Sequence, residues 1–218
     1  MKVVKIKNRD KSYTIGKIIC LGRNYVEHII ELGNTQSENP VIFLRPPSNV
    51  VYSGDKIVYP GYSNDMHHET ELLLLIGKTI KNAGYKEAEE AIIGYGVGLD
   101  MTLRDIQNHV KSKGHPWEIS KCFDTSAVIS EFIAKEDYTV TLKEKITLTV
   151  NDEIRQNEPL NKMILKPVEA VMFISKYMTI EEGDIVFTGT PAGVSKVEKG
   201  DKLKAEITNI GSLEVEVI

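Results

Sequence analysis

Apolar and polar residues along this chain fall mostly into short segments that alternate or are rich in β-branched residues. Such segments are typical of strands, because successive side chains on a strand point to opposite faces of a sheet. The pattern predicts strands over residues 2–7, 12–21, 41–45, 56–59, 71–80, 92–99, 127–133, 145–156, 184–188 and 202–217. We therefore expect a β-rich chain.

Turn residues and a few helical segments complete the predicted elements. Hairpins are expected at Gly54-Asp55, Asn151-Asp152 and Asn209-Ile210-Gly211. Helices are predicted over residues 25–32, 86–91, 103–113 (behind Thr102) and 167–178 (opened by Pro167). Because helices and strands do not alternate regularly, we expect an α+β fold with a mixed, curved, largely antiparallel β-sheet system and a few short helices.

Length and charge narrow the class of protein. With 218 residues the chain fits one domain, residues 1–218, in which residues 1–15 form a short N-terminal strand extension. Its 27 Lys and Arg against 31 Asp and Glu are scattered, which argues against a basic face for nucleic acid. Its apolar runs fall short of the roughly 20 residues that span a membrane, and its start does not resemble a signal peptide. We expect a cytoplasmic protein that binds neither nucleic acid nor membrane.

Three acids stand at the ends of apolar segments. Glu69 and Glu71 open the apolar run of residues 72–76, and Asp100 closes the glycine-rich segment 94–100. On a strand Glu69 and Glu71 point the same way, roughly 7 Å apart, and two like charges that close favour a cation. If Asp100 lies on a neighbouring strand end, the three carboxylates form the all-oxygen site that magnesium prefers. The Glu-x-Glu spacing alone is more typical of a solvated strand end.

Softer ligands near these acids do not indicate another metal. His67 and His68 precede Glu69, but adjacent residues point to opposite faces of a strand, so both histidines cannot join the acids in a zinc site. Cys20 and Cys122 lack metal-site spacing, and we interpret them as small buried hydrophobic residues. The predicted cofactor is Mg²⁺, with Mn²⁺ or Ca²⁺ as alternatives.

A short predicted helix carries a histidine and a glutamate on one face. Asn24 is a suitable N-cap with Glu27 three residues on, and Gly33 suits the left-handed position that ends a helix. His28 and Glu31 are three residues apart, so the carboxylate can orient the imidazole and leave its other nitrogen to take a proton from water. The pair is also typical of a solvated helix face, and the short helix fits a lid.

Several further groups are candidates for contacts around these acids. Arg104 and Gln107 lie in the first turn of the helix after Asp100, where they can hold carboxylates or a metal-bound water in place. Lys121 is by default a surface charge, but near a metal it can stabilise negative charge on oxygen. The Thr-Gly-Thr-Pro turn of residues 188–191 is either a plain connection or a source of hydroxyl and N–H donors.

These residues occur in segments whose order is specific. The segments are Cys20-Leu21-Gly22-Arg23-Asn24-Tyr25, His28 with Glu31, Phe43-Leu44-Arg45-Pro46, His67-His68-Glu69-Thr70-Glu71-Leu72, Leu99-Asp100-Met101-Thr102 with Arg104, Asp105 and Gln107, Pro116-Trp117 with Ser120-Lys121, and Glu182-Gly183-Asp184 with Thr188-Gly189-Thr190-Pro191. In this order they resemble the fumarylacetoacetate hydrolase family, in its short single-domain branch of acylpyruvate hydrolases and oxaloacetate decarboxylases. The resemblance covers nearly the whole chain.

The resemblance implies a fold, a site and an assembly. It implies the curved mixed β-roll of the family and a homodimer. The implied metal ligands are Glu69, Glu71 and Asp100; the implied catalytic residues are His28, Glu31 and Lys121; and the implied substrate contacts are Arg23, Asn24, Arg45, Arg104, Gln107 and Thr190. Relatives often carry lysine in place of Arg45, and the arginine fork recognises a carboxylate differently.

The implied function is metal-dependent cleavage of a carbon–carbon bond in a 2-oxo acid that contains a pyruvyl group, through a metal-bound enolate. Acylpyruvate hydrolysis, oxaloacetate decarboxylation or both are the expected reactions. The alternatives are an isomerase, tautomerase or decarboxylase of a 2-hydroxy-dienedioate in aromatic catabolism, and a divalent-metal-binding module without turnover.

Overall fold

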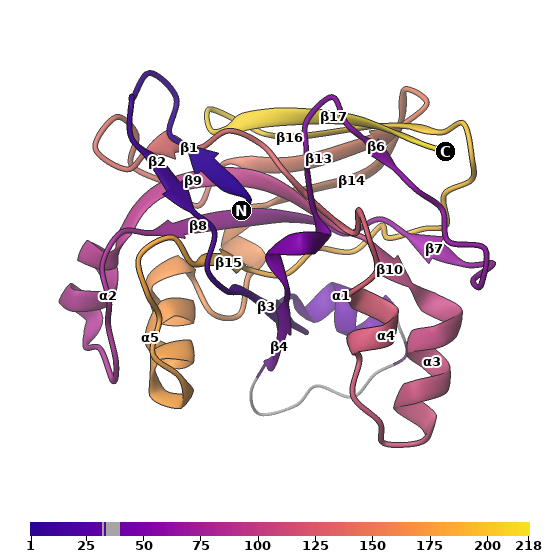
Figure 1. Cartoon of the computed structure of the whole chain (residues 1–218), viewed down its shortest axis with the longest axis horizontal. Coiled ribbons are helices and arrows are strands. Elements are labelled where there is room, and N and C mark those ends of the chain that lie inside the picture. The colour runs from indigo at the N-terminus through magenta and orange to yellow at the C-terminus, as the bar shows by residue number, and fades with distance from the viewer. Residues whose placement is uncertain (32, 34–39) are drawn as a thin grey trace.

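Two sheets form most of the structure, a computed structural model that describes residues 1–31, 33 and 40–218 (Figure 1). The larger sheet has eight strands. Its order is β4 (Val41–Arg45), β3 (Ile18–Gly22), β15 (Ile185–Phe187), β8 (Thr70–Ile76), β9 (Ile92–Asp100), β11 (Ala127–Ile129) and β5 (Val50–Tyr52), with β12 (Ile133–Ala134) also paired to β9. The pairs β3–β15 and β5–β11 are parallel and the other pairs antiparallel, so the sheet is mixed as expected.

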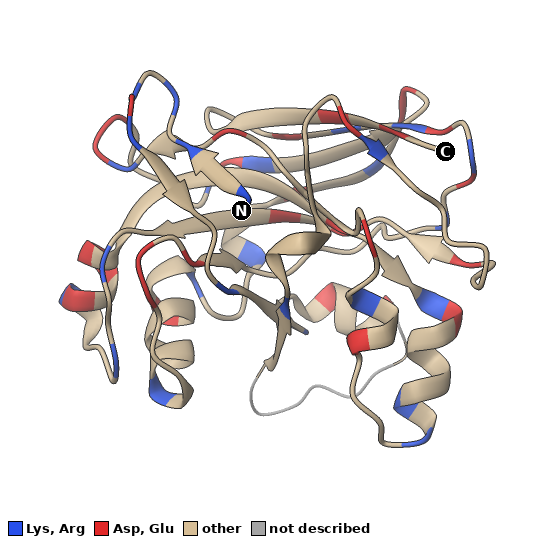
Figure 2. Ribbon diagram, viewed as in Figure 1, with Lys and Arg blue, Asp and Glu red and all other residues tan. Residues whose placement is uncertain are grey.

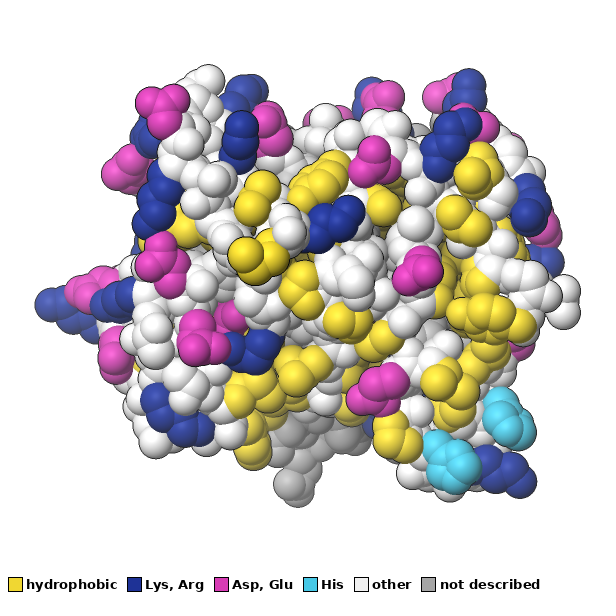
Figure 3. Space-filling view, in the orientation of Figure 1, with side chains coloured by type: hydrophobic (Ala, Val, Ile, Leu, Met, Phe, Trp, Pro, Cys, Tyr) yellow, Lys and Arg dark blue, Asp and Glu magenta, His cyan; other side chains and the backbone are white. Residues whose placement is uncertain are grey.

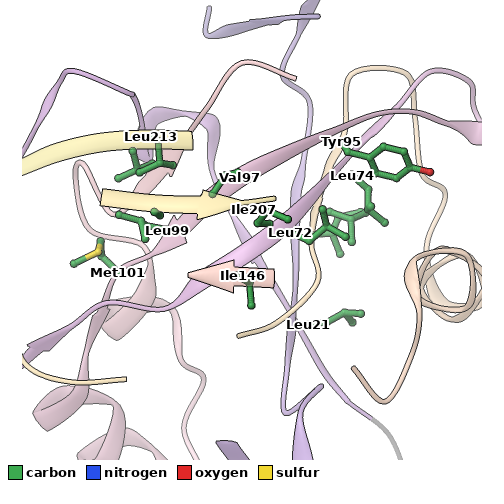
Figure 4. Packing of buried hydrophobic residues seen from close by; sticks show 14 of the residues in the cluster. Leu21, Leu72, Leu74, Tyr95, Val97, Leu99, Met101, Ile146, Ile207 and Leu213 are labelled. Atoms are coloured by element: carbon green, nitrogen blue, oxygen red, sulfur yellow. The ribbon is translucent and has the colours of Figure 1, made fainter. Parts of the chain in front are cut away.

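The smaller sheet has five strands and lies over β8 and β9, along the top of Figure 1. Its order is β14 (Glu153–Pro159), β13 (Lys145–Val150), β16 (Lys202–Ile207), β17 (Gly211–Val217) and β6 (Lys56–Ile57). Inward and outward residues alternate along β13, β16 and β17. Leu72 and Val97 of the larger sheet belong to one apolar core with Ile146, Ile207 and Leu213 of the smaller sheet (Figure 4).

Short helices lie on the other side of β8 and β9 from the five-stranded sheet (Figure 1). They are α1 (Val26–Glu31), α2 (Tyr85–Ala91), α3 (Arg104–Ser112), α4 (Glu118–Lys121) and α5 (Pro167–Tyr177), with 3₁₀ turns at Pro47–Asn49 and Leu160–Lys162. Two small sheets pair β1 (Val3–Lys5) with β2 (Ser12–Thr14), and β7 (Met66–His67) with β10 (Thr102–Leu103). Among the described residues, no helix is long and apolar enough to cross a membrane.

The predicted fold class is confirmed, while several predicted boundaries are wrong. The segment 12–21 divides into β2 and β3 because the chain between them turns against Asp184, whose carboxylate accepts a hydrogen bond from the Lys17 N–H at 2.6 Å. The hairpin at Asn151-Asp152 is confirmed, and both residues have the positive φ that such turns require. Gly54-Asp55 forms no hairpin, because it leads from β5 in one sheet to β6 in the other.

Two predicted helices begin one residue later than expected. Helix α1 begins at Val26, and the Asn24 side chain bonds instead to the backbone of Leu165 and Thr188. Thr102 lies in β10, and α3 begins at Arg104 without a side-chain cap. Gly33 has the expected positive φ of 62°, whereas residue 32, the predicted end of this helix, lies outside the described residues.

Charged residues are dispersed over strands, helices and loops (Figure 2).

Candidate active site

The three predicted metal ligands converge where β8 and β9 meet. Glu69 immediately precedes β8, and Glu71 lies within it. Asp100 ends β9, which is antiparallel to β8, and the Asp100 N–H donates to the Glu69 carbonyl at 2.8 Å. The three side chains are buried, and one carboxylate oxygen of each lies within 4.8 Å of the other two. The described chain therefore contains an all-oxygen cluster inside the molecule and not at a solvated strand end.

Three buried cations surround these acids. The Lys121 Nζ donates to Glu69 Oε2 and Asp100 Oδ2, both at 2.8 Å, and to Thr102 Oγ1 at 2.6 Å. Arg104 forms an ion pair with Glu69, and Arg45 forms one with Asp100. The side chains of all three cations are at most 5% exposed. Three carboxylates are thus matched by three cations, as burial of charge requires.

The acids differ in how well they are compensated. Burial alone would raise the pKa of Glu69, but the charges of Lys121 and Arg104 outweigh it and hold that pKa well below its usual range. Burial and the charge of Glu69 raise the pKa of Glu71 to about 8. The hydrogen bond found for the Glu71 carboxylate comes from the Gly189 N–H at 2.6 Å, and no described cation is paired with it. Glu71 is therefore the acid with the most to gain from a further cation.

The donor set fits a hard divalent cation. Glu69, Glu71 and Asp100 offer carboxylate oxygens, which Mg²⁺ and Mn²⁺ prefer, and each oxygen retains lone pairs beyond those used by Lys121, Arg45 and Arg104. His67 and His68 do not join them. The His67 Nε2 lies 2.9 Å from Asp65 Oδ1, and the His68 Nε2 lies 3.0 Å from Ser195 Oγ.

His28 and Glu31 form the predicted pair on α1. The His28 Nδ1 lies 3.2 Å from Glu31 Oε2, and Glu31 Oε1 accepts a hydrogen bond from the Gly193 N–H at 2.9 Å. Burial alone would raise the pKa of Glu31, but the hydrogen bonds from His28 and Gly193 hold it below its usual value. An ionised Glu31 can only accept, so Nδ1 carries the proton and Nε2 is the basic nitrogen.

One pocket collects most of the predicted site residues, with about 470 Å³ of empty space that is partly open to solvent. Apolar walls come from Leu21, Ile29, Phe43 and Trp117. The predicted site residues that line it are Arg23, His28, Glu69, Glu71, Asp100, Arg104, Gln107, Lys121 and Thr190. The predicted metal ligands, the predicted base and several hydrogen-bond donors therefore share one cavity.

Two predicted substrate contacts are not brought to this pocket. The Asn24 side chain is bonded to the backbone of Leu165 and Thr188, at 2.8 to 3.0 Å. The Arg45 guanidinium lies behind the acids, where it binds Asp100, Ser126 Oγ at 2.6 Å and the Met101 carbonyl at 3.0 Å. Arg45 therefore holds a carboxylate of the protein, through several donors that a lysine could not supply together.

Sequence reasoning missed two residues at the site. Lys111 lines the pocket and follows Arg104 and Gln107 on the same face of α3, so the spacing of three and then four residues was a usable signal. Gln156 of β14 donates from Nε2 to Thr190 Oγ1 at 2.8 Å and accepts from the Thr70 N–H at 3.1 Å. It is far from both partners in the chain, and no local pattern singles it out.

Comparisons with known proteins agree with this geometry. The family model described as Fumarylacetoacetate (FAA) hydrolase C-terminal matches residues 17–218. The chain is 40% identical over 192 residues to oxaloacetate tautomerase YcgM of Escherichia coli K12, and the alignment covers 88% of each chain. It is 38% identical over 200 residues to human mitochondrial oxaloacetate tautomerase FAHD1, covering 92% of this chain and 90% of that one.

A solved structure is also closely similar. It is a fumarylpyruvate hydrolase from Pseudomonas aeruginosa in complex with Mn²⁺ and pyruvate, 36% identical to this chain. The TM-score is 0.95, and the superposition covers 100% of this chain and 95% of that one.

Proposed function

Because the chain belongs to the fumarylacetoacetate hydrolase family, we propose that it is a metal-dependent enzyme acting on small 2-oxo acids that contain a pyruvyl group. The reaction class is formation or protonation of an enolate beside the 2-oxo group, with oxaloacetate and acylpyruvates as the substrates. One observation carries the proposal: His28, which is paired with Glu31, lines the same pocket as the Glu69, Glu71 and Asp100 carboxylates.

The charge of the pocket supports an anionic substrate. Arg45, Arg104 and Lys121 already match the three acids, so a bound divalent cation leaves the site positive by its own full charge. Arg23 adds positive charge to the lining. A compound with two carboxylates, such as oxaloacetate or fumarylpyruvate, suits this balance better than a neutral ketone.

Glu69, Glu71 and Asp100 would hold the metal, and we propose Mg²⁺ with Mn²⁺ as an effective substitute. When bound, the ion supplies Lewis-acid polarisation of the 2-oxo group and offsets the negative charge that develops on its oxygen. Its ligands are supported by the charge of Lys121 and Arg104 on Glu69 and of Arg45 on Asp100. The Mn²⁺ in the Pseudomonas hydrolase complex is consistent with this choice.

His28 moves the proton in the proposed reaction. Its Nε2 takes a proton from the carbon beside the 2-oxo group in tautomerisation, or from water in acylpyruvate hydrolysis, and Glu31 stabilises the resulting imidazolium. Oxaloacetate decarboxylation needs no such water, because carbon dioxide leaves and only the enolate has to be protonated. Gln107 accepts from Arg104 at 2.5 Å through Oε1, so its NH₂ group is left to donate to the substrate.

The test is a panel of 2-oxo acids assayed with purified protein. Loss of the oxaloacetate enol absorbance reports tautomerisation, pyruvate formation reports decarboxylation, and loss of acylpyruvate absorbance reports hydrolysis. We expect turnover with added Mg²⁺ or Mn²⁺ and none after chelation. No consumption of any compound with metal present, including 2-hydroxy-dienedioates, would favour a metal-binding module without turnover.

We also propose that residues 1–218 act as one catalytic domain and that the chain forms a homodimer in the cytoplasm. Exposed apolar side chains include Val3, Leu44, Val58 and Ile119, and hydrophobic side chains extend across the face seen in Figure 3. Apolar surface on this scale suits a second copy of the chain. Light scattering coupled to gel filtration should report twice the mass of the chain.

A further inference from the structure

Gln156 stands out among the strands of the five-stranded sheet. It is 0% exposed, and every other buried position in these strands is apolar. A β-bulge explains its direction, because Leu148 pairs with Gln156 while Thr149 pairs with Ile154, which leaves Arg155 as the extra residue. Bulges re-aim side chains, and this one turns an amide toward the pocket wall.

The partners of Gln156 determine how its amide is oriented. Its Oε1 accepts from the Thr70 N–H at 3.1 Å, a group that can only donate. Its Nε2 donates to Thr190 Oγ1 at 2.8 Å and to the Pro191 carbonyl at 2.9 Å, and that carbonyl can only accept. Only one assignment of oxygen and nitrogen satisfies both backbone groups. The NH₂ group therefore faces Thr190.

This orientation determines what the Thr190 hydroxyl can do. Since Thr190 Oγ1 accepts from Gln156, its own hydrogen is left to donate, and no acceptor for it is found among residues 1–31, 33 and 40–218. Thr190 lines the pocket that holds the acids and His28. We propose that Gln156 is a positioning residue that keeps the Thr190 hydroxyl as a hydrogen-bond donor to the carboxylate of the bound substrate. The inference rests on the proposed function.

The turn that carries Thr190 contacts β14 and the carboxylates of Glu71 and Glu31. Gly193 has a φ of 98°, and a Cβ at this position would lie 2.1 Å from the Arg155 carbonyl oxygen, beside Gln156. The Gly189 N–H binds Glu71, and the Gly193 N–H binds Glu31. The turn thus touches a metal ligand, the catalytic pair and the bulge of β14, so a change at Gln156 can reach the substrate through Thr190.

The surroundings of Gln156 suit a neutral amide. The amide is already bonded on both sides, since its Oε1 accepts from the Thr70 N–H and its Nε2 donates to Thr190 Oγ1. A glutamate at position 156 would have the same shape and could still accept from Thr70. It would accept from Thr190 as well, and would turn the hydroxyl hydrogen away from the pocket.

A double-mutant cycle tests the proposal, with pyruvate binding to the Mn²⁺-loaded protein measured by calorimetry. Gln156→Met keeps the volume of the side chain but removes the donor, and Thr190→Val removes the hydroxyl. Each should weaken pyruvate binding about tenfold, the effect of one hydrogen bond to a charged group, and raise KM for oxaloacetate more than it lowers kcat. If Gln156 acts through Thr190, the double variant should bind pyruvate no more weakly than Thr190→Val.

Two measurements separate positioning from general support. Mn²⁺ affinity of Gln156→Met should stay within about threefold of the parent, far less than the 10- to 100-fold typical of groups that support a metal ligand. Ser175→Ala is the matched control, because it removes a buried hydroxyl that accepts from the Ala83 N–H at 3.0 Å away from the pocket. It should lower the melting temperature and leave pyruvate affinity unchanged.

The outcomes distinguish failure of the positioning role from failure of the proposed function. Additive losses in the double variant, or parent-like pyruvate binding by Gln156→Met, overturn the positioning role while the proposed function stands. A parent protein that neither binds pyruvate nor consumes any 2-oxo acid overturns the proposed function and this inference with it. Should Gln156→Met not fold, Gln156→Glu replaces it, with at least the same tenfold loss expected and parent-like affinity as the contradicting result.

Discussion

The two large sheets differ in where their polar residues lie, buried in the first and mostly exposed in the second. In the eight-stranded sheet, β8 is buried along its whole length and includes Thr70 and Glu71, and the neighbouring β9 ends in the buried Asp100. In the five-stranded sheet, residues of β13, β16 and β17 alternate between solvent and core, and Gln156 of β14 is the polar exception among the buried positions. One sheet holds the charges of the site, and the other covers the core behind them.

The difference shows where the energetic cost of function lies. A buried ion costs several kcal/mol unless it is paired, and Glu69, Glu71 and Asp100 are retained together with the buried cations that offset them. Apart from Gln156, the five-stranded sheet carries no such cost, because its buried positions follow the ordinary apolar pattern of a strand face. Substitutions in the two sheets should therefore differ in kind: loss of function at the acid cluster of the first, and loss of stability at the apolar positions of the second.

The largest effect is expected at the acid cluster. Glu71→Gln removes the charge of a proposed metal ligand. Mn²⁺ affinity should therefore fall at least about 100-fold, the upper range for groups that only support a ligand. Turnover of oxaloacetate should disappear with it. Calorimetric titration with Mn²⁺ measures the first effect, and the enol absorbance assay the second.

Glu144→Gln is the matched control for this change. Glu144 is also buried, but its carboxylate binds Tyr138 and Thr141 outside the pocket. It should leave Mn²⁺ affinity unchanged. A Glu71→Gln variant that is fully active without metal would falsify the assignment of the acid cluster as a metal site.

The next largest effect is expected at the base. His28→Ala removes the imidazole that Glu31 orients, so acylpyruvate hydrolysis should slow by about 10²- to 10⁴-fold, the usual contribution of general base catalysis. Oxaloacetate decarboxylation should keep a good part of its rate, because it needs no activated water. Steady-state assays of both reactions on one preparation make the comparison. The control is His109→Ala, which changes an exposed histidine on α3.

Equal loss of both reactions in His28→Ala would contradict a role confined to water activation. It would instead place His28 in substrate binding or in protonation of the enolate.

The sequence predicted much of the fold because most strands are encoded locally. Alternation identified β13, β16 and β17, and the turn at Asn151-Asp152 identified the hairpin between β13 and β14. The strands β7 and β10 were missed because each has two residues, too few for a periodic pattern. Helix α4 was missed for the same reason, with four residues.

The site was predictable only where chemistry and chain position coincide. Glu69 and Glu71 could be found because acids rarely open an apolar run, and His28 and Glu31 because a spacing of three residues makes them neighbours on a helix. The contact between Glu31 and Gly193 spans 162 residues, and no sequence pattern contains it. Arg45 was expected at the substrate from the family resemblance alone, because no sequence pattern reveals which carboxylate an arginine meets.

The contact between β14 and the turn that follows β15 should give an intermediate effect. In Gly193→Ala the new Cβ would lie 2.1 Å from the Arg155 carbonyl oxygen, so the turn that carries Thr190 has to move away from β14. We expect a loss of stability greater than the about 1–3 kcal/mol of an unfavourable backbone conformation alone, together with reduced activity. Urea unfolding and the oxaloacetate assay measure the two.

Gly200→Ala is the control that measures the cost of the unfavourable backbone conformation alone. Gly200 has a φ of 94°, close to the 98° of Gly193, but a Cβ there would have no atom within 4 Å. It should cost about 1–3 kcal/mol and leave activity unchanged. Equal destabilisation by both substitutions would show that the carbonyl contact does not constrain the turn.

The smallest effect is expected on the outer face of the five-stranded sheet. Lys204 pairs across the strands with Glu214, 3.3 Å away, and both side chains are more than half exposed. Lys204→Ala should change the free energy of unfolding by less than about 1 kcal/mol, as exposed ion pairs do, and should leave kcat and KM unchanged. The adjacent Leu203 faces the core, and Leu203→Ala should cost about 2–5 kcal/mol. A comparable loss of unfolding free energy from both substitutions, measured by urea unfolding, would contradict the one-sided burial of this sheet. Altered kcat or KM in Lys204→Ala would contradict the confinement of function to the inner face of the sheet.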